Sequence, residues 1–87
     1  MIMFYTYILK SKKNGNLYIG YTHNLTKRFE EHNQGLNIST KPYMPWEIIY
    51  YEACLDMEDA KRREGYFKTT QGRRLLRRRL KEYFYKN

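Results

Sequence analysis

The chain has 87 residues and no Pro-, Gly- or Ser-rich linker or internal repeat, so we expect one small domain spanning residues 1–87 and exclude a multidomain enzyme. No apolar run approaches membrane-spanning length, and the N-terminus lacks the basic region of a signal peptide, so we expect a cytoplasmic protein that does not enter a membrane. The single cysteine, Cys54, excludes an internal disulfide, and its aromatic and aliphatic neighbours favour a place in the core.

Charge is divided unevenly along the chain. Residues 1–60 hold 6 Lys and Arg against 7 Asp and Glu, whereas residues 61–87 hold 11 against 2. Such a basic block suits a phosphate backbone, because each Lys or Arg that meets a phosphate releases condensed counterions. A solvated helix face that only aids solubility is the alternative. The steepness of the asymmetry in so short a chain favours nucleic-acid binding.

Three segments have the composition and alternation of β-strands. Residues 2–10 are rich in aromatic and β-branched side chains, and their alternation places Tyr7 and Ile8 on opposite faces. Residues 17–22 resume the alternation after a polar connection that contains Asn-Gly, which predicts an antiparallel hairpin. Residues 46–53 form the third predicted strand.

Three helices are predicted in the remainder of the chain. Asn24 can cap a helix over residues 25–33 that ends at Gly35, and Asp56 can cap a second helix. Thr70 can cap a third helix, with basic side chains facing outward. Its inward stripe comprises Leu75, Leu76, Leu80 and Phe84. The order ββαβαα predicts an α+β fold, a small three-stranded antiparallel sheet flanked by three helices.

Glu64 breaks the apolar pattern of the second predicted helix. It shares a stripe with Met57, Ala60 and Phe67, at spacings of three, four and three residues. Desolvating a carboxylate is costly, so a cation should meet this side chain if it is buried. The pattern alone leaves three interpretations open: a buried Glu–Arg pair, a Glu at the edge of the stripe that reaches water, or a metal-binding or catalytic carboxylate.

Four other residues combine groups that suit phosphate chemistry. Arg28 and His32 lie one turn apart on the first helix and can face the same side. An Arg spreads charge over two phosphate oxygens, while a His moves a proton. Tyr7 and Tyr18 lie on neighbouring strands, where pairing can bring both hydroxyls to one face. A phenol has a pKa near 10, so it acts as a base only beside a stabilising cation.

Several other candidates have ordinary structural interpretations. His23 lies next to the predicted cap Asn24 and is interpreted as a surface residue. Tyr50 and Tyr51 suit a half-buried strand and need no function.

Short motifs occur in a fixed order along the chain. Tyr5-Thr6-Tyr7 is followed by Tyr18-Ile19-Gly20, by Arg28 ten residues after Tyr18, and by Ala60-Lys61-Arg62-Arg63-Glu64. This ordered set resembles the GIY-YIG nuclease superfamily, specifically its small single-domain bacterial members, from Tyr5 to about Leu76. The chain departs from the pattern at Tyr5-Thr6, where Gly-Ile is typical, and at Tyr21, where excision-repair members carry Lys.

The resemblance implies a metal-dependent catalytic site. Glu64 would be the single carboxylate ligand of Mg²⁺ or Mn²⁺. Tyr18 would align or deprotonate the attacking water, with Tyr7 orienting it or contacting the scissile phosphate. Arg28 would stabilise the phosphorane-like transition state, and His32 would transfer a proton or hold a hydrogen bond. No small-molecule cofactor is expected.

The leading hypothesis is a metal-dependent endonuclease, with DNA as the favoured substrate. Further residues are expected to contact the nucleic acid: Tyr21, Lys68, Arg73, Arg74, Arg77 and Arg78. The alternatives are a non-catalytic nucleic-acid-binding module, which would stack bases on Tyr66, Tyr83 or Tyr85, and a protein-interaction domain. The sequence leaves open the oligomeric state and whether the substrate is duplex, single-stranded, branched or damaged DNA, or RNA.

Overall fold

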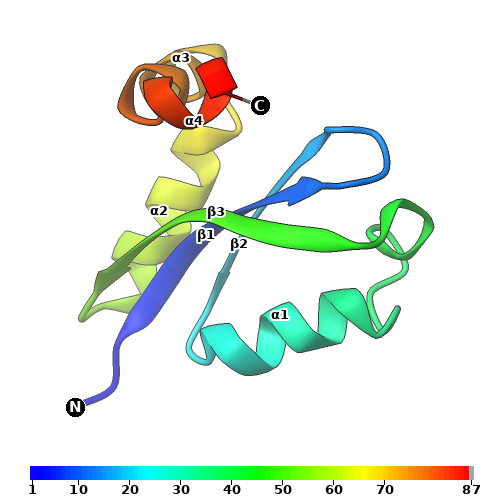
Figure 1. The fold of residues 1–87 in the computed structure, drawn as a ribbon. Helices are drawn as coiled ribbons and strands as arrows, with labels where there is room; N and C mark the ends of the chain where they lie inside the picture. The colour runs from blue at the N-terminus through cyan, green and yellow to red at the C-terminus, as the bar shows by residue number, and fades with distance from the viewer. Residues whose placement is uncertain (87) are drawn as a thin grey trace.

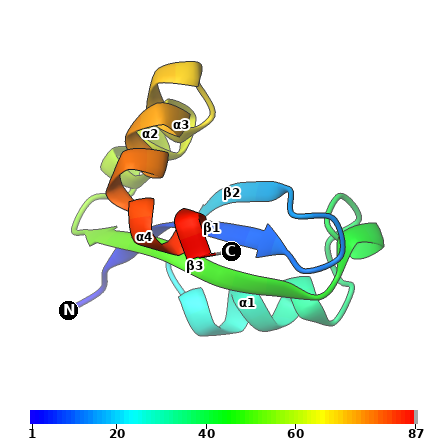
Figure 2. The same cartoon turned by 45° about the horizontal axis from the view of Figure 1, so that its top comes forward.

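A three-stranded antiparallel sheet forms the centre of the molecule, and helices cover both of its faces (Figures 1 and 2). The computed structural model describes residues 1–86. The strands are β1 (Phe4–Ser11), β2 (Leu17–Thr22) and β3 (Trp46–Cys54), in the order β2-β1-β3. The helices are α1 (Leu25–Asn33), α2 (Met57–Phe67), α3 (Thr70–Arg79) and α4 (Lys81–Lys86), with a 3₁₀ turn η1 (Lys41–Tyr43) before β3. The predicted α+β class and the antiparallel sheet are confirmed.

Alternation along the central strand divides the hydrophobic interior between the two faces of the sheet. Ile8 packs with Ile19, Phe67 and Leu76 beneath α2 and α3. The second core cluster lies on the face of the sheet that α1 covers, the α1 face. It comprises Tyr7, Leu9 and Trp46, with Tyr18, Leu25, Phe29, Met44 and Ile48 packed against it. The predicted separation of Tyr7 from Ile8 is therefore confirmed.

The first two helices begin at the caps predicted for them, and α1 also ends at its predicted signal, Gly35. The side chain of Asn24 accepts a hydrogen bond from the backbone N–H of Lys27, and that of Asp56 accepts one from Glu58. Gly35 follows α1 with a φ of 76°, where the backbone N–H of Leu36 reaches the carbonyl of Glu31 at 3.1 Å. A side chain at Gly35 would be strained in that left-handed conformation.

The C-terminal helix differs from its prediction in two respects. Its cap is Thr69 rather than Thr70, because the hydroxyl of Thr69 accepts from the backbone N–H of Gly72. The helix also breaks at Leu80, and α4 turns back to the sheet. There the hydroxyl of Tyr83 donates to Glu47 of β3 at 2.5 Å, a contact that a straight extension of α3 would forgo.

Two further features of the chain follow from the fold. Cys54 is half-buried and its thiol donates to the carbonyl of Asp56 at 3.3 Å. The prediction of a core position for Cys54 is wrong, because this residue ends an edge strand beyond both core clusters. Within residues 1–86, the helices are too short or too polar to cross a membrane.

Candidate active site

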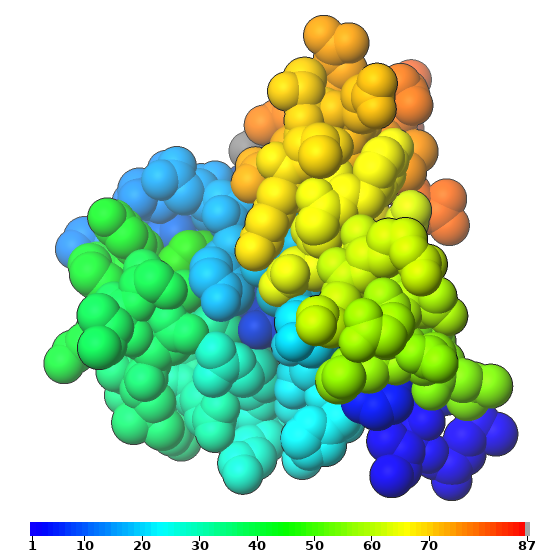
Figure 3. Space-filling model, turned by 180° about the vertical axis from the view of Figure 1, so that it is seen from behind, coloured from blue at the N-terminus to red at the C-terminus, as the bar shows by residue number. Residues whose placement is uncertain are grey.

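A cleft of about 390 Å³ opens beside β2, between α1 and α2. Figure 3 shows the hollow from behind, with α1 in cyan on one side and α2 in yellow-green on the other. The residues of the predicted site that line the cleft are Tyr7, Tyr18, Tyr21, Arg28 and Glu64. These five come from β1, β2, α1 and α2, so the fold brings together groups that are far apart in the sequence.

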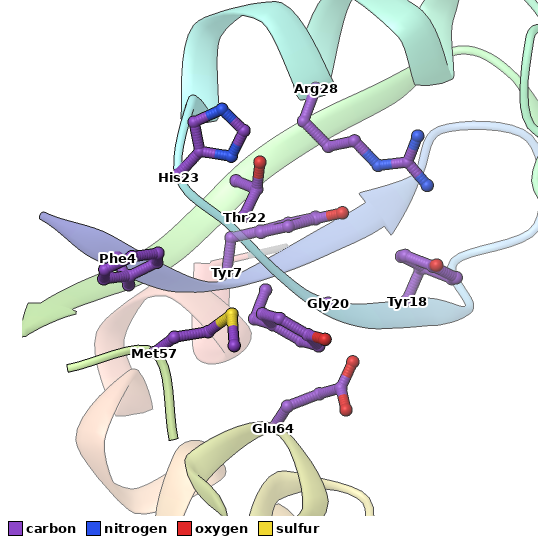
Figure 4. Close-up of a pocket in the computed structure, with 10 residues that line it drawn as sticks. Phe4, Tyr7, Tyr18, Gly20, Thr22, His23, Arg28, Met57 and Glu64 are labelled. Atoms are coloured by element: carbon purple, nitrogen blue, oxygen red, sulfur yellow. The ribbon is translucent and has the colours of Figure 1, made fainter. Parts of the chain in front are cut away.

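The cleft takes side chains from both faces of the sheet. Tyr7 and Tyr18 belong to the α1 face, and their ring centroids lie 6.4 Å apart. Tyr21 is paired with Thr6, whose hydroxyl donates to the carbonyl of Ala60 in α2, which places Tyr21 on the α2 face. Figure 4 shows Arg28 approaching from α1 and Glu64 from α2, with the rings of Tyr7 and Tyr18 between them.

Gly20 provides the space that the Tyr7 ring occupies. The two residues are directly opposed on β1 and β2. A Cβ atom on Gly20 would lie 2.5 Å from the Tyr7 hydroxyl oxygen, closer than real Cβ atoms come to a neighbour. The Tyr-Ile-Gly motif therefore has a steric basis here, because any larger residue would displace Tyr7.

A chain of hydrogen bonds runs from Tyr7 into the interior. The hydroxyl of Tyr7 lies 3.0 Å from Nε2 of His32, and Nδ1 of His32 lies 2.8 Å from Oγ1 of Thr40. The hydroxyl of Thr40 in turn donates to the carbonyl of Asn37 at 3.4 Å. Because the proton of Thr40 is directed to Asn37, Oγ1 of Thr40 accepts from Nδ1–H of His32, and Nε2 is left to accept the proton of Tyr7. Nε2 of His32 is then the acceptor, and Nδ1 carries the proton that is donated to Thr40.

Burial keeps both members of this pair neutral. It raises the pKa of Tyr7 to about 12, although the hydrogen bond from Arg28 acts in the opposite direction. Burial and the nearby charge of Arg28 lower the pKa of His32 to about 4. His32 is fully buried behind Tyr7 and does not line the cleft, so it can act on a substrate only through Tyr7.

Arg28 is held as a cation at the wall of the cleft. Its Nη1 lies 3.1 Å from Oε1 of Glu31. Burial alone would lower the pKa of Arg28, but hydrogen bonds to Tyr7 and Glu31 outweigh it and raise the pKa. The guanidinium has five N–H donors, so these two contacts leave others for an oxyanion in the cleft.

Glu64 lies at the edge of the apolar stripe of α2, with 23% of its side chain exposed. The cation that meets it is Lys68, whose Nζ lies 3.7 Å from Oε2, rather than an arginine. Within residues 1–86 no group of three or more His, Cys, Asp or Glu side chains converges. One carboxylate beside an open cleft nevertheless fits Mg²⁺ or Mn²⁺, since these hard cations keep several waters and take substrate phosphate oxygens as ligands.

The predicted nucleic-acid contacts on α3 lie outside the cleft lining. Arg73 donates from Nε to the carbonyl of Phe67 at 3.0 Å, and the guanidinium of Arg77 lies 4.9 Å from the ring centroid of Phe84. Arg74 and Arg78 are exposed, and no carboxylate within residues 1–86 forms an ion pair with either. Arg77 is exposed as well, so three of these four arginines keep a solvent-facing charge.

The structure adds residues that the sequence did not single out for the site. Phe4, Thr22, His23 and Met57 complete the wall of the cleft, and Thr40 holds His32. His23 follows β2 directly, so its place after the Tyr-Ile-Gly strand is a signal that could have identified it. No comparable signal exists for Thr40, because the connection between α1 and β3 has no regular pattern.

Comparison with known proteins agrees with this architecture and site. The model of the GIY-YIG catalytic domain matches residues 3–77. The chain therefore belongs to the GIY-YIG family and is a nuclease-type domain of its small single-domain bacterial kind.

Its relatives include UPF0213 proteins. The one from Clostridium perfringens is 40% identical over 67 residues, which cover 76% of this chain and 71% of the relative. The one from Staphylococcus haemolyticus is 40% identical over 70 residues, which cover 79% of this chain and 84% of the relative. The solution NMR structure of a UPF0213 protein from Bacillus halodurans is similar with a TM-score of 0.54 and 28% identity, covering 86% of this chain and 82% of that structure.

Proposed function

We propose that the protein is a metal-dependent endonuclease that hydrolyses nucleic-acid phosphodiesters, with DNA as the favoured substrate. One observation carries the proposal: Tyr7, Tyr18, Arg28 and Glu64 line the same cleft although they come from four different elements. Binding alone requires no carboxylate opposite an arginine and two phenols. A phosphodiester that enters this cleft would meet a cationic wall at α1 and a carboxylate at α2.

Glu64 would hold one Mg²⁺ or Mn²⁺ ion. When bound, such an ion stabilises negative charge on the leaving oxygen. The carboxylate is suited to this role because it faces the cleft and is only partly exposed. Lys68 would exchange its contact with Glu64 for a phosphate oxygen of the substrate.

The chain's own groups would position the phosphate and the attacking water. Arg28, fixed by Tyr7 and Glu31, would donate to the phosphate oxygens as negative charge develops. Tyr18 would align the water, since its ring is half-buried and packs 4.8 Å from that of His32, centroid to centroid. Tyr7 would remain protonated, because burial raises its pKa to about 12, and would hold Arg28 rather than act as the base. His32 would fix the Tyr7 hydroxyl from behind.

The test is cleavage of labelled single-stranded, duplex and branched DNA with Mg²⁺ or Mn²⁺. The Glu64→Gln variant is expected to lose at least about 100-fold in rate, since metal-assisted stabilisation amounts to several kcal/mol. Glu30→Gln is the matched control, because Glu30 is an exposed carboxylate on α1 outside the cleft. Equal rates for Glu64→Gln and wild type would refute the proposed role of the carboxylate.

The same experiment separates the second candidate function. The exposed charges of Arg74 and Arg78 also suit a non-catalytic nucleic-acid-binding module. Salt-sensitive binding by wild type without cleavage of any of the three DNAs would favour that module over the nuclease.

A further inference from the structure

Two shallow hollows continue the cleft around the N-terminal end of α1. The first, of about 260 Å³, is lined by Thr22, His23, Asn24, Lys27, Arg28 and Glu31. The second, of about 290 Å³, is lined by Tyr5, His23, Asn24, Leu25, Thr26 and Tyr51. His23 lines the cleft and both hollows, so the three lie side by side along one surface.

Tyr51 dominates the far hollow and is unusually exposed for an aromatic residue within the sheet. It lies directly opposite Tyr7 on the α1 face, yet 54% of Tyr51 is exposed against 1% of Tyr7. The difference arises because α1 packs over the α1-face core around Tyr7 and Tyr18, whereas only its first residues border Tyr51. Its ring is set edge-on to that of Tyr5, with centroids 6.0 Å apart and an interplanar angle of 62°.

The two hollows differ in chemistry in a way that suits successive parts of a nucleotide. The near hollow carries Lys27 and Arg28, and Glu31 is paired to Arg28. Lys27 forms no ion pair within residues 1–86, so its charge remains for a phosphate. The far hollow presents an exposed aromatic ring on which a base can stack whatever its identity. A paired base within a duplex stacks on its neighbours, so its faces are not available to Tyr51.

We propose that Tyr51 and Tyr5 form a base-stacking shelf for an unpaired nucleotide next to the cut, with Lys27 holding the intervening phosphate. The shelf rests on the proposed nuclease function and specifies its substrate class. The preferred substrate is a nucleic acid that is single-stranded, or locally unpaired, beside the scissile phosphate. The bound strand runs from the cleft, past His23, to Tyr51.

The test measures binding in EDTA, where cleavage does not occur, by fluorescence anisotropy of a labelled single strand and of the blunt duplex of the same sequence. Tyr51→Ala is expected to weaken single-strand binding about 5- to 150-fold, the range for removal of one stacking aromatic residue. Tyr51→Phe should bind as wild type does, because stacking needs the ring and not the hydroxyl. Duplex affinity should be unchanged in both variants.

Tyr43→Ala is the matched control, since Tyr43 is 41% exposed and lies in η1, away from the three hollows. Circular dichroism melts confirm that the variants are folded. The shelf is refuted if wild type does not bind the single strand, if Tyr51→Ala binds it as wild type does, or if single strand and duplex are weakened equally. Because no metal is present, these outcomes are independent of the Glu64→Gln cleavage comparison.

Discussion

The hydroxyl of Tyr7 lies 3.0 Å from Nε2 of His32, and the two side chains are almost completely buried. Because the hydroxyl of Thr40 donates to the carbonyl of Asn37, its oxygen accepts from Nδ1 of His32, and Nε2 of the neutral imidazole accepts the proton of Tyr7. A protonated His32 would set an N–H against the O–H of Tyr7 and force the hydroxyl to rotate away.

Stability should therefore decrease on mild acidification. The pKa of His32 is lowered to about 4 in the fold, against about 6.5 in an unfolded chain. As the pH falls below about 6.5, His32 binds a proton in the unfolded state but not in the folded state. The contribution of neutral His32 to the free energy of unfolding, complete above that pH, is therefore lost progressively down to about pH 4. We expect a loss on the order of 3 kcal/mol over this window, measured by urea unfolding.

Two histidine variants check this assignment. His32→Gln should be less stable than wild type above about pH 6.5, yet it should lose much less stability between about pH 6.5 and 4. His23→Gln replaces an exposed histidine and should retain the wild-type pH dependence. The assignment to His32 fails if His32→Gln retains the full acid sensitivity.

Gly20→Ala should displace Tyr7 and thereby impair cleavage. The added Cβ would lie 2.5 Å from the Tyr7 hydroxyl, so the ring or β2 must shift, at a cost of about 1–3 kcal/mol in the free energy of unfolding. Gly65→Ala is the contrasting control, because a Cβ at this helical position meets nothing within 4 Å and should add up to about 1 kcal/mol. Thermal melts should show a lower stability for Gly20→Ala and a higher stability for Gly65→Ala. Cleavage rates should fall for Gly20→Ala and not for the control.

Much of this arrangement could be predicted because its signals are local. Alternation predicted that Tyr7 and Ile8 lie on opposite faces of the sheet, and the spacing of Arg28 and His32 predicted that these two face the same side of their helix. In the structure His32 contacts Tyr7, and Arg28 lines the same cleft as Tyr7. The depth of His32 could not be predicted, since it depends on Thr40 in a connection without periodicity. The break at Leu80 was also not predicted, because it serves a contact between Tyr83 and Glu47, which are 36 residues apart.

Removing Lys68 should strengthen metal binding at Glu64. The ammonium of Lys68 lies 3.7 Å from the carboxylate that would bind the ion, and the two cations compete for it. The pair is partly exposed and therefore weak, so Lys68→Met should bind Mn²⁺ up to about fivefold more tightly. Free Mn²⁺ can be followed by electron paramagnetic resonance.

Lys61→Met is the control for Lys68→Met. It removes a lysine from the same helix, one that pairs with Glu58 at 3.9 Å instead of with Glu64. Its Mn²⁺ affinity should equal that of wild type. An unchanged affinity in Lys68→Met would contradict competition at the carboxylate.

The salt dependence of DNA binding should show whether the arginines of α3 contact phosphates. Arg74 and Arg78 are exposed and have no carboxylate partner within residues 1–86. If both contact phosphates, Arg74→Gln/Arg78→Gln should reduce the slope of log affinity against log salt by about 2 on duplex DNA. Lys12→Gln/Lys13→Gln, in the turn between β1 and β2, removes the same charge and should leave the slope nearly unchanged. Equal slopes for the arginine double variant and wild type would exclude these contacts.

Tyr7 belongs both to the core cluster beneath α1 and to the wall of the cleft. Changes to this ring therefore alter stability and chemistry together, and a library selected for activity should tolerate almost nothing at this position. The other cluster, Ile8, Ile19, Phe67 and Leu76, lines none of the cleft. Neutral substitutions and stabilising redesign can therefore be made in this cluster, which lies on the opposite face of the same sheet.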